Sequence, residues 1–217
     1  MTCKQLYDLV SVHHPFLGVT EFLVYYNTAV RILAYNSKIL KGTTTSFDSV
    51  ASTLAYDDTQ IGAVSGTLWS DIITVHEVTF DGDTISRMIG QKPRIGVYDN
   101  LKTDQHYWWV ENDKLNIAKG GSPTTYNTAG KAIIIYNTYH PADLTAATLL
   151  TASPAFDARF HDAIMYHIIA QVYMDPRNFD IEKSTFFDMK YNMILKAAKK
   201  ESRMKKYNAG YIVHRTF

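Results

Sequence analysis

Apolar residues recur at helical spacing in both end regions of the chain and lose this spacing in the middle. The pattern predicts a first helix over residues 3–13. It predicts a second helix that has Thr20 as its N-cap and ends at Gly42. The helical pattern returns near Pro154, in a helix apolar on two sides, which is typical of a central helix packed from both directions. A last helix is predicted over about residues 180–206. On it we expect these residues to face inward: Phe186, Phe187, Met189, Tyr191, Met193, Ile194, Ala197 and Ala198.

The middle of the chain favours strands. Threonine, valine and isoleucine are frequent there, and turn residues separate them. A hairpin turn is predicted at residues 111–113, and residues 84–89 favour a single helical turn. The clearest predicted strands are residues 72–80, 107–110, 114–118 and 131–139.

These elements predict an α+β fold. We expect an antiparallel helical bundle, made of an N-terminal and a C-terminal helix pair, with an inserted small antiparallel β domain and an extended C-terminal tail. The helical domain would be discontinuous, comprising residues 1–42 and 150–208. The β domain would span residues 43–149 and the tail residues 209–217.

The net charge of +1 conceals an uneven distribution. Residues 43–176 contain eight basic and fifteen acidic groups, whereas residues 177–217 contain ten basic and four acidic groups. The basic groups at the end of the last helix suit a solvated face, contact with nucleic-acid phosphates, or an acidic partner surface, including that of a neighbouring copy. This basic cluster consists of Lys196, Lys199, Lys200, Arg203, Lys205 and Lys206.

Composition excludes several classes of protein. A single cysteine, Cys3, can form neither an intramolecular disulfide nor a thiolate zinc site. The first residues lack the basic and apolar regions of a signal peptide, and no apolar run approaches the roughly 18 residues of a membrane span. A soluble protein of a reducing compartment is expected.

No catalytic, metal or cofactor motif stands out. His13 and His14 diverge by about 100° on a helix, and Asp157 with His161 is explained by an ordinary helix-surface pair. The segment from Asp81 lacks a calcium ligand at Ile85, and residues 130–132 lack the remainder of a phosphate loop. We therefore predict no catalytic residue, metal ligand or cofactor.

The order of helix pair, β insertion, helix pair and tail resembles the head-to-tail adaptor (connector or neck-ring) proteins of tailed bacteriophages. The β insertion ends in an aromatic strand, a hairpin and a long strand, at residues 107–117 and 131–139. The most specific part is the helical end, which reads FHDAIMYHIIAQVY over residues 160–173, FFDMKY over 186–191 and AAKK over 197–200.

The resemblance implies a structural protein of the virion neck, assembled in the cytoplasm of the bacterial host. It implies a homo-oligomeric ring of about a dozen copies beneath the portal protein, in contact with downstream tail or neck proteins. The ring would extend the DNA channel and contact the DNA without sequence specificity. No membrane is implied as a partner. The basic cluster would lie near the channel, the portal or a neighbouring subunit. The docking segment for the portal would comprise Tyr211, Ile212, Val213, His214, Arg215 and Phe217.

Two other classes of function stay open. A β-domain binding module would use Trp108 and Trp109 with Trp69 as an aromatic platform for carbohydrate or peptide. Adjacent strand residues point to opposite faces, so only one of the paired tryptophans would line such a platform. The other class is an enzyme whose site has no readable motif.

Overall fold

The computed structural model describes residues 1–44, 46–51, 53–59, 61, 69–87, 105–119 and 129–208. The fold is α+β, with helices and antiparallel strand pairs in separate parts of the chain. The chain divides into two compact units, Met1–Leu40 with the chain from His140 onward, and Lys41–Tyr139. We call these the helical unit and the β unit. Among the described residues, no helix is both long and apolar enough to cross a membrane.

The first helix, α1 (Cys3–His13), is fixed at its start by side-chain capping. The Thr2 hydroxyl accepts a hydrogen bond from the Gln5 amide at 3.2 Å, and the Gln5 side chain accepts one from the Thr2 amide at 2.8 Å. Cys3, Leu6 and Val10 form its buried side. The predicted bounds of this helix are confirmed.

Both ends of helix α2 (Val19–Ser37) differ from the prediction. Its N-cap is Gly18 instead of Thr20, and it ends five residues before Gly42. Lys38 adopts a left-handed conformation with φ of 53°, and its amide closes the helix on the Ala34 carbonyl at 2.9 Å. Gly42 lies instead in a strand, where a Cβ would come within 3.0 Å of the Tyr139 ring.

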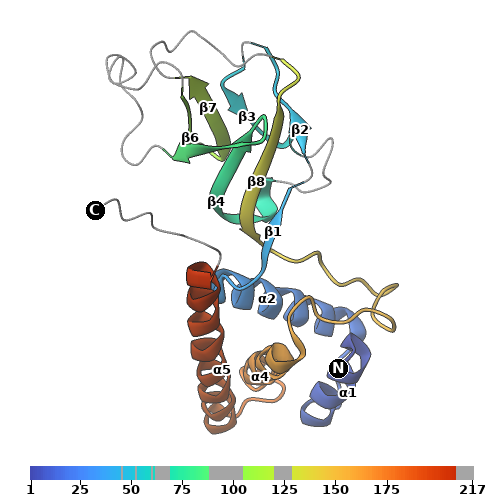
Figure 1. The fold of residues 1–217 in the computed structure, drawn as a ribbon. Coiled ribbons are helices and arrows are strands. Elements are labelled where there is room, and N and C mark those ends of the chain that lie inside the picture. Colours follow the sequence, from blue (N-terminus) through green and yellow to red (C-terminus); the bar gives the residue numbers. More distant parts are fainter. Residues whose placement is uncertain are drawn as a thin grey trace, which may run out of the picture. The chain divides into compact units, whose positions relative to one another are not determined.

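Helix α4 (His161–Val172) packs against α1, α2 and α5 (Ile181–Asn208), as its two apolar sides predicted (Figure 1). It starts later than expected, after a turn of 3₁₀ helix at Ala158–Phe160 in which the Asp157 side chain caps the Arg159 amide. The buried residues of α4 include Ala163, Ile164, Ile168, Ile169 and Val172.

The prediction of the inward face of helix α5 (Ile181–Asn208) was wrong in part. The buried positions are Ser184, Tyr191, Leu195 and Ala198, which follow helical spacing along one side. On the opposite side, Phe186, Met189, Met193 and Ala197 are exposed.

The end of the β unit also differs from the expected boundary after residue 149. Asn27 of α2 holds Leu144 through two hydrogen bonds, from Asn27 Nδ2 to the Leu144 carbonyl at 3.1 Å and from the Leu144 amide to Asn27 Oδ1 at 2.8 Å. Arg31 pairs with Asp143 at 3.1 Å. Residues 140–149 therefore belong to the helical unit.

The strands of the β unit form one sheet in the order β1-β8-β4-β5-β6-β7-β3, with β2 also paired to β8 (Figure 1). Among the described strands, only the β5–β6 pair is parallel. The bounds are β1 Lys41–Thr43, β2 Phe47–Asp48, β3 Ala55–Tyr56, β4 Ile72–Phe80, β5 Asp83–Arg87, β6 His106–Glu111, β7 Lys114–Lys119 and β8 Ala132–Tyr139, with a 3₁₀ turn at Trp69–Asp71.

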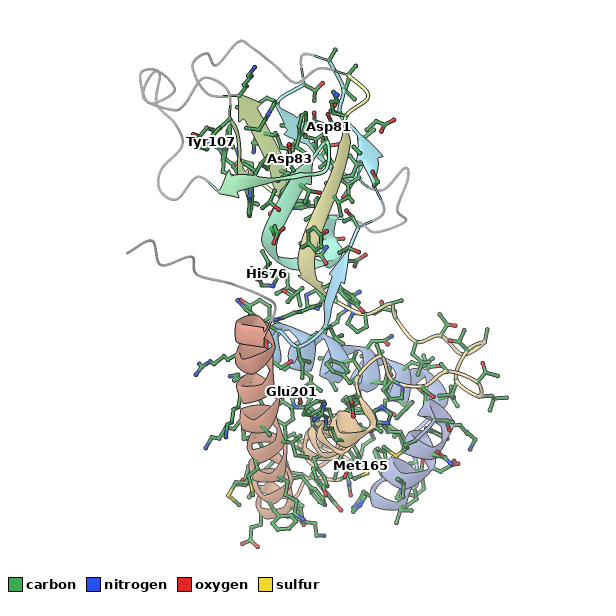
Figure 2. The ribbon with its side chains drawn as sticks, viewed as in Figure 1. His76, Asp81, Asp83, Tyr107, Met165 and Glu201 are labelled. Carbon is green, nitrogen blue, oxygen red and sulfur yellow. The ribbon has the colours of Figure 1, made fainter. Side chains whose placement is uncertain are left out.

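Two turns set the strand pairing. The predicted hairpin turn is confirmed, because Asn112 and Asp113 have φ values of 49° and 54° and join the antiparallel strands β6 and β7. Residues 84–87 lie in strand β5, so the helical turn expected at residues 84–89 is wrong there, and residues 88 and 89 lie outside the described part of the chain. Asp81 and Gly82 have φ values of 54° and 90° and return the chain onto β4 as β5. Figure 2 labels Asp81 and Asp83 at this turn.

Candidate interaction surface

An exposed row of large apolar side chains runs along helix α5, on the side opposite its buried face. Phe186, Met189 and Met193 are 48%, 56% and 71% exposed. Their spacing of i, i+3 and i+7 places them on one side of the helix. We call these three residues the α5 stripe. Grouped apolar residues on a surface often mark a contact with another molecule, and methionine and aromatic residues are enriched in protein interfaces.

Contacts with the rest of the helical unit fix which face of α5 points outward. The Ser184 hydroxyl donates to the Ala170 carbonyl at 3.0 Å, and the Tyr191 ring packs 4.8 Å from the His167 ring. Farther along, the Ser202 hydroxyl donates to the Lys38 carbonyl at 2.8 Å. Because these contacts span the helix, turning the α5 stripe inward would break all of them.

An ion pair strengthens this attachment near the end of the described side chains. Arg159 Nη2 lies 2.9 Å from Glu201 Oε1, which is labelled in Figure 2. The pair joins the 3₁₀ turn before α4 to α5. Exposed ion pairs contribute only about 0–1 kcal/mol, so its role is mainly to fix the helix orientation.

A lysine lies beside the aromatic end of the α5 stripe. Lys190 Nζ is 4.8 Å from the centre of the Phe186 ring and 5.4 Å from that of Tyr166. The Phe187 ring meets Phe186 edge-on at 5.3 Å and stacks on Tyr173 at 6.1 Å. Phe186 thus packs on an inner aromatic ring while about half of it stays exposed, and aromatic residues are enriched at protein interfaces.

The basic cluster continues the outward side of α5 toward its end. Lys196, Lys199, Lys200 and Arg203 are exposed, and none of them forms an ion pair with another residue that the structure describes. Lys196 and Lys200 follow Met193 on nearly the same side. Lys205 and Lys206 lie in the same helix, but their side chains are outside the described part of the structure. The face is thus apolar in its first half and cationic in its second.

The predicted docking segment cannot be placed against this surface. Tyr211, Ile212, Val213, His214, Arg215 and Phe217 all lie outside the described residues.

The predicted tryptophan platform is contradicted by burial. Trp69, Trp108 and Trp109 are 8%, 1% and 8% exposed. Trp108 lies in the main apolar core of the β unit with Ile117 and Ile135, and Trp109 packs on the opposite face against Ala118 and Leu54. The indoles thus stabilise the sheet instead of offering an open face for carbohydrate or peptide. The two adjacent tryptophans do point to opposite faces of the sheet, as predicted, but apolar side chains pack against both of them.

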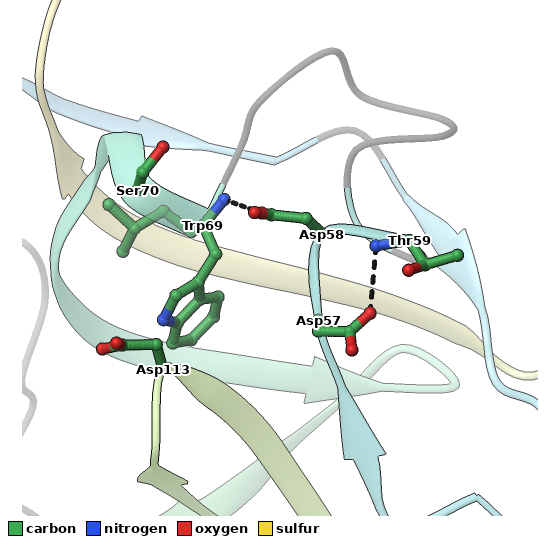
Figure 3. A pocket seen from close by; sticks show the side chains of 7 residues that line it. Asp57, Asp58, Thr59, Trp69, Ser70 and Asp113 are labelled. Carbon is green, nitrogen blue, oxygen red and sulfur yellow. Dashed lines mark hydrogen bonds between the residues drawn. The ribbon is translucent and has the colours of Figure 1, made fainter.

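Trp69 forms one wall of an acidic pocket of about 530 Å³ (Figure 3). Asp57, Asp58 and Asp113 also line it. Asp58 accepts a hydrogen bond from the Trp69 amide, Asp57 Oδ1 accepts one from the Thr59 amide at 3.0 Å, and Asp57 Oδ2 pairs with Lys114 at 3.0 Å. The bond from Lys114 lowers the pKa of Asp57, helped by the Thr59 amide. Asp57 and Asp58 are therefore both bonded to neighbouring groups in the wall of the pocket.

Asp157 and His161, which were considered as a ligand pair from sequence, have other partners in the structure. His161 Nε2 bonds the Phe156 carbonyl at 2.9 Å, while Asp157 caps the 3₁₀ turn and pairs with Arg159. His167 is buried against Tyr191, and burial lowers its pKa. Each of these residues thus has a structural role. Sequence reasoning missed the α5 stripe because its residues were assigned to the core.

The chain matches no protein-family model and no curated protein sequence.

Proposed function

We propose that this chain is a non-enzymatic structural protein of a tailed-bacteriophage virion. Copies of it would form a ring that joins the portal vertex of the capsid to the tail and extends the DNA channel. The observation that carries this proposal is the outward face of α5, which combines the exposed α5 stripe with a run of cations that have no ion-pair partner among the described residues. The architecture that we propose is that of head-to-tail adaptors: an antiparallel helical bundle with an inserted β domain and a C-terminal tail that docks on the portal.

The α5 stripe would pack against a neighbouring copy in the ring. Burial of a fully exposed Phe or Met side chain contributes about 1.5–3 kcal/mol, so three partly exposed ones supply enough energy to favour a repeated contact. In a closed ring every copy uses the same two surfaces, and no α5 stripe is left in water.

The charge of the two units supports contact between unlike surfaces. Counted over the whole sequence, the β unit contains eleven acidic and eight basic residues, for a charge of −3, and the helical unit carries +4. Opposite charges on different parts of one subunit favour its association with a second copy in a fixed orientation. The contrast is smaller than the segment counts predicted, because residues 140–176 belong to the helical unit.

The basic cluster would face the DNA channel, the portal or the next subunit. Cations along a DNA channel hold the phosphate backbone without reading its sequence, so such contacts weaken as the salt concentration rises. The tail residues 211–217 would reach the portal.

The proposal is tested by measuring the mass of the purified chain, alone and with the portal protein of the same virus, by native mass spectrometry and light scattering. We expect a ring, alone or on the portal, with a fixed number of copies. Negative-stain images of the same sample should show an annulus with a central channel. A chain that stays monomeric under both conditions would contradict the proposal.

A further inference from the structure

The ends of three helical segments bring one histidine and two carboxylates together. His14 follows α1, Glu21 lies in the first turn of α2, and Asp175 lies in the turn after α4. One possible ligand atom from each of the three lies within 4.8 Å of the other two. This cluster is entirely within the helical unit and separate from the α5 stripe and the basic cluster.

His14 is the unusual member of the cluster. It is only 1% exposed, and its buried Nε2 atom has no hydrogen-bond partner in the described structure. A buried polar atom without a partner is destabilising, and such atoms call for an explanation by a bound group or water. A buried imidazole together with two carboxylates is a set of donors typical of a transition-metal site.

Arg177 now neutralises the two carboxylates. Its Nε lies 3.0 Å from Asp175 Oδ1, and its Nη2 contacts both Asp175 Oδ2, at 2.8 Å, and Glu21. These bonds hold the pKa of Asp175 well below its usual range. The Arg177 side chain is 56% exposed, so it approaches from the solvent side and can swing out, and it makes no hydrogen bond to His14 that would satisfy the imidazole.

Surrounding contacts hold the three segments in place. The Asn178 side chain donates to the His13 carbonyl at 3.1 Å, and His13 Nδ1 lies 3.1 Å from the Tyr173 hydroxyl. The Tyr25 hydroxyl donates to Asp175 Oδ2 at 3.4 Å. Hydrogen bonds of this kind orient metal ligands in proteins.

We propose that His14, Glu21 and Asp175 bind a divalent transition-metal ion of the Zn²⁺ class, with Arg177 acting as an internal cation that competes for the same carboxylates. Ligand atoms around a tetrahedral zinc ion lie roughly 3.3 Å apart, so side-chain rotations that close a gap of about 1.5 Å would complete the site. Water would fill the fourth position. The ion would join the end of α1, the start of α2 and the turn after α4, and would satisfy the imidazole that the guanidinium leaves unpaired.

The test is calorimetric titration of the full chain with Zn²⁺ after treatment with chelator, with Co²⁺ absorption as a second readout of ligand geometry. We expect one ion per chain for the unaltered protein. Glu21→Gln should weaken binding at least about tenfold and His14→Gln about a hundredfold, because each removes a ligand. Arg177→Gln should strengthen binding about tenfold, since it removes the competing cation.

Arg31→Gln is the matched control. Arg31 is another surface arginine paired with an aspartate, Asp143, and its loss should leave Zn²⁺ affinity unchanged. Zinc binding that is unaffected by Glu21→Gln and Arg177→Gln would overturn the proposal, as would the absence of binding by both the unaltered chain and Arg177→Gln. Both of these variants replace side chains that reach solvent, so the outcome does not depend on whether His14→Gln folds.

Discussion

Replacing the α5 stripe with glutamines should separate assembly from folding. In the variant Phe186→Gln, Met189→Gln, Met193→Gln, helix propensity is nearly kept and no buried side chain is lost. Scaling about 1.5–3 kcal/mol per fully buried side chain by the exposed fractions of 48%, 56% and 71% gives about 3–5 kcal/mol for the three residues. This corresponds to a loss of roughly two to four orders of magnitude in the association constant of each subunit contact.

Sedimentation velocity over a concentration series measures this change, and denaturant unfolding of the dilute protein checks the fold. We expect the triple variant to remain monomeric where the unaltered chain forms rings, and to stay folded. By the same scaling, the buried fractions of the three side chains limit the loss in its free energy of unfolding to about 2–4 kcal/mol. Leu150→Gln is the control, because Leu150 is 67% exposed but lies outside α5. Equal assembly by the triple variant and the unaltered chain would refute the role of the α5 stripe.

Three further predictions concern charge, the tail and pH. Reversing Lys199, Lys200 and Arg203 to Glu should reduce DNA retention or ring assembly with little effect on stability, and normal DNA packaging by this variant would indicate an ordinary solvated face. Deleting residues 211–217 should abolish binding to the portal while the circular dichroism spectrum stays the same, whereas normal particle assembly would remove the docking role. Burial lowers the pKa of His167 in the folded state, so its contribution to stability is complete above the unfolded pKa of about 6.5 and declines as pH falls through that value. Chemical unfolding between pH 7 and 5 should therefore show a loss of stability that is smaller in His167→Phe, and equal pH slopes would contradict this.

The sequence predicted the fold well wherever a local signal determined the structure. Strand β4 has the predicted bounds, and the turn at Asn112 and Asp113 was identified from its residues alone. The start of α1 follows from a capping box that involves only Thr2 and Gln5. In each case the interactions that decide the structure lie within a few residues of one another.

The errors come from contacts between distant parts of the chain. Gly42 was predicted to end a helix, but it lies in strand β1, where the Tyr139 ring leaves no room for a side chain. The end of the β unit was placed too late because Asn27, over a hundred residues earlier, holds Leu144.

The candidate surface was hidden for a related reason. An apolar residue on a helix is normally read as core, so Met189 and Met193 were assigned inward although Tyr191 and Leu195 already fill that side. The grouping of His14 with Glu21 and Asp175 depends on the packing of three segments and has no signature in residue spacing.

The location of the protein in assembled particles tests the central claim most directly. Particles of the virus whose genome encodes this chain would be imaged by electron microscopy, with the β6–β7 turn at Asn112 carrying a small affinity tag and a labelled binder. We predict a ring of label at the single vertex where the tail joins the capsid, between portal and tail. Label distributed over the capsid, label only at the far end of the tail, or particles without the protein would contradict the account.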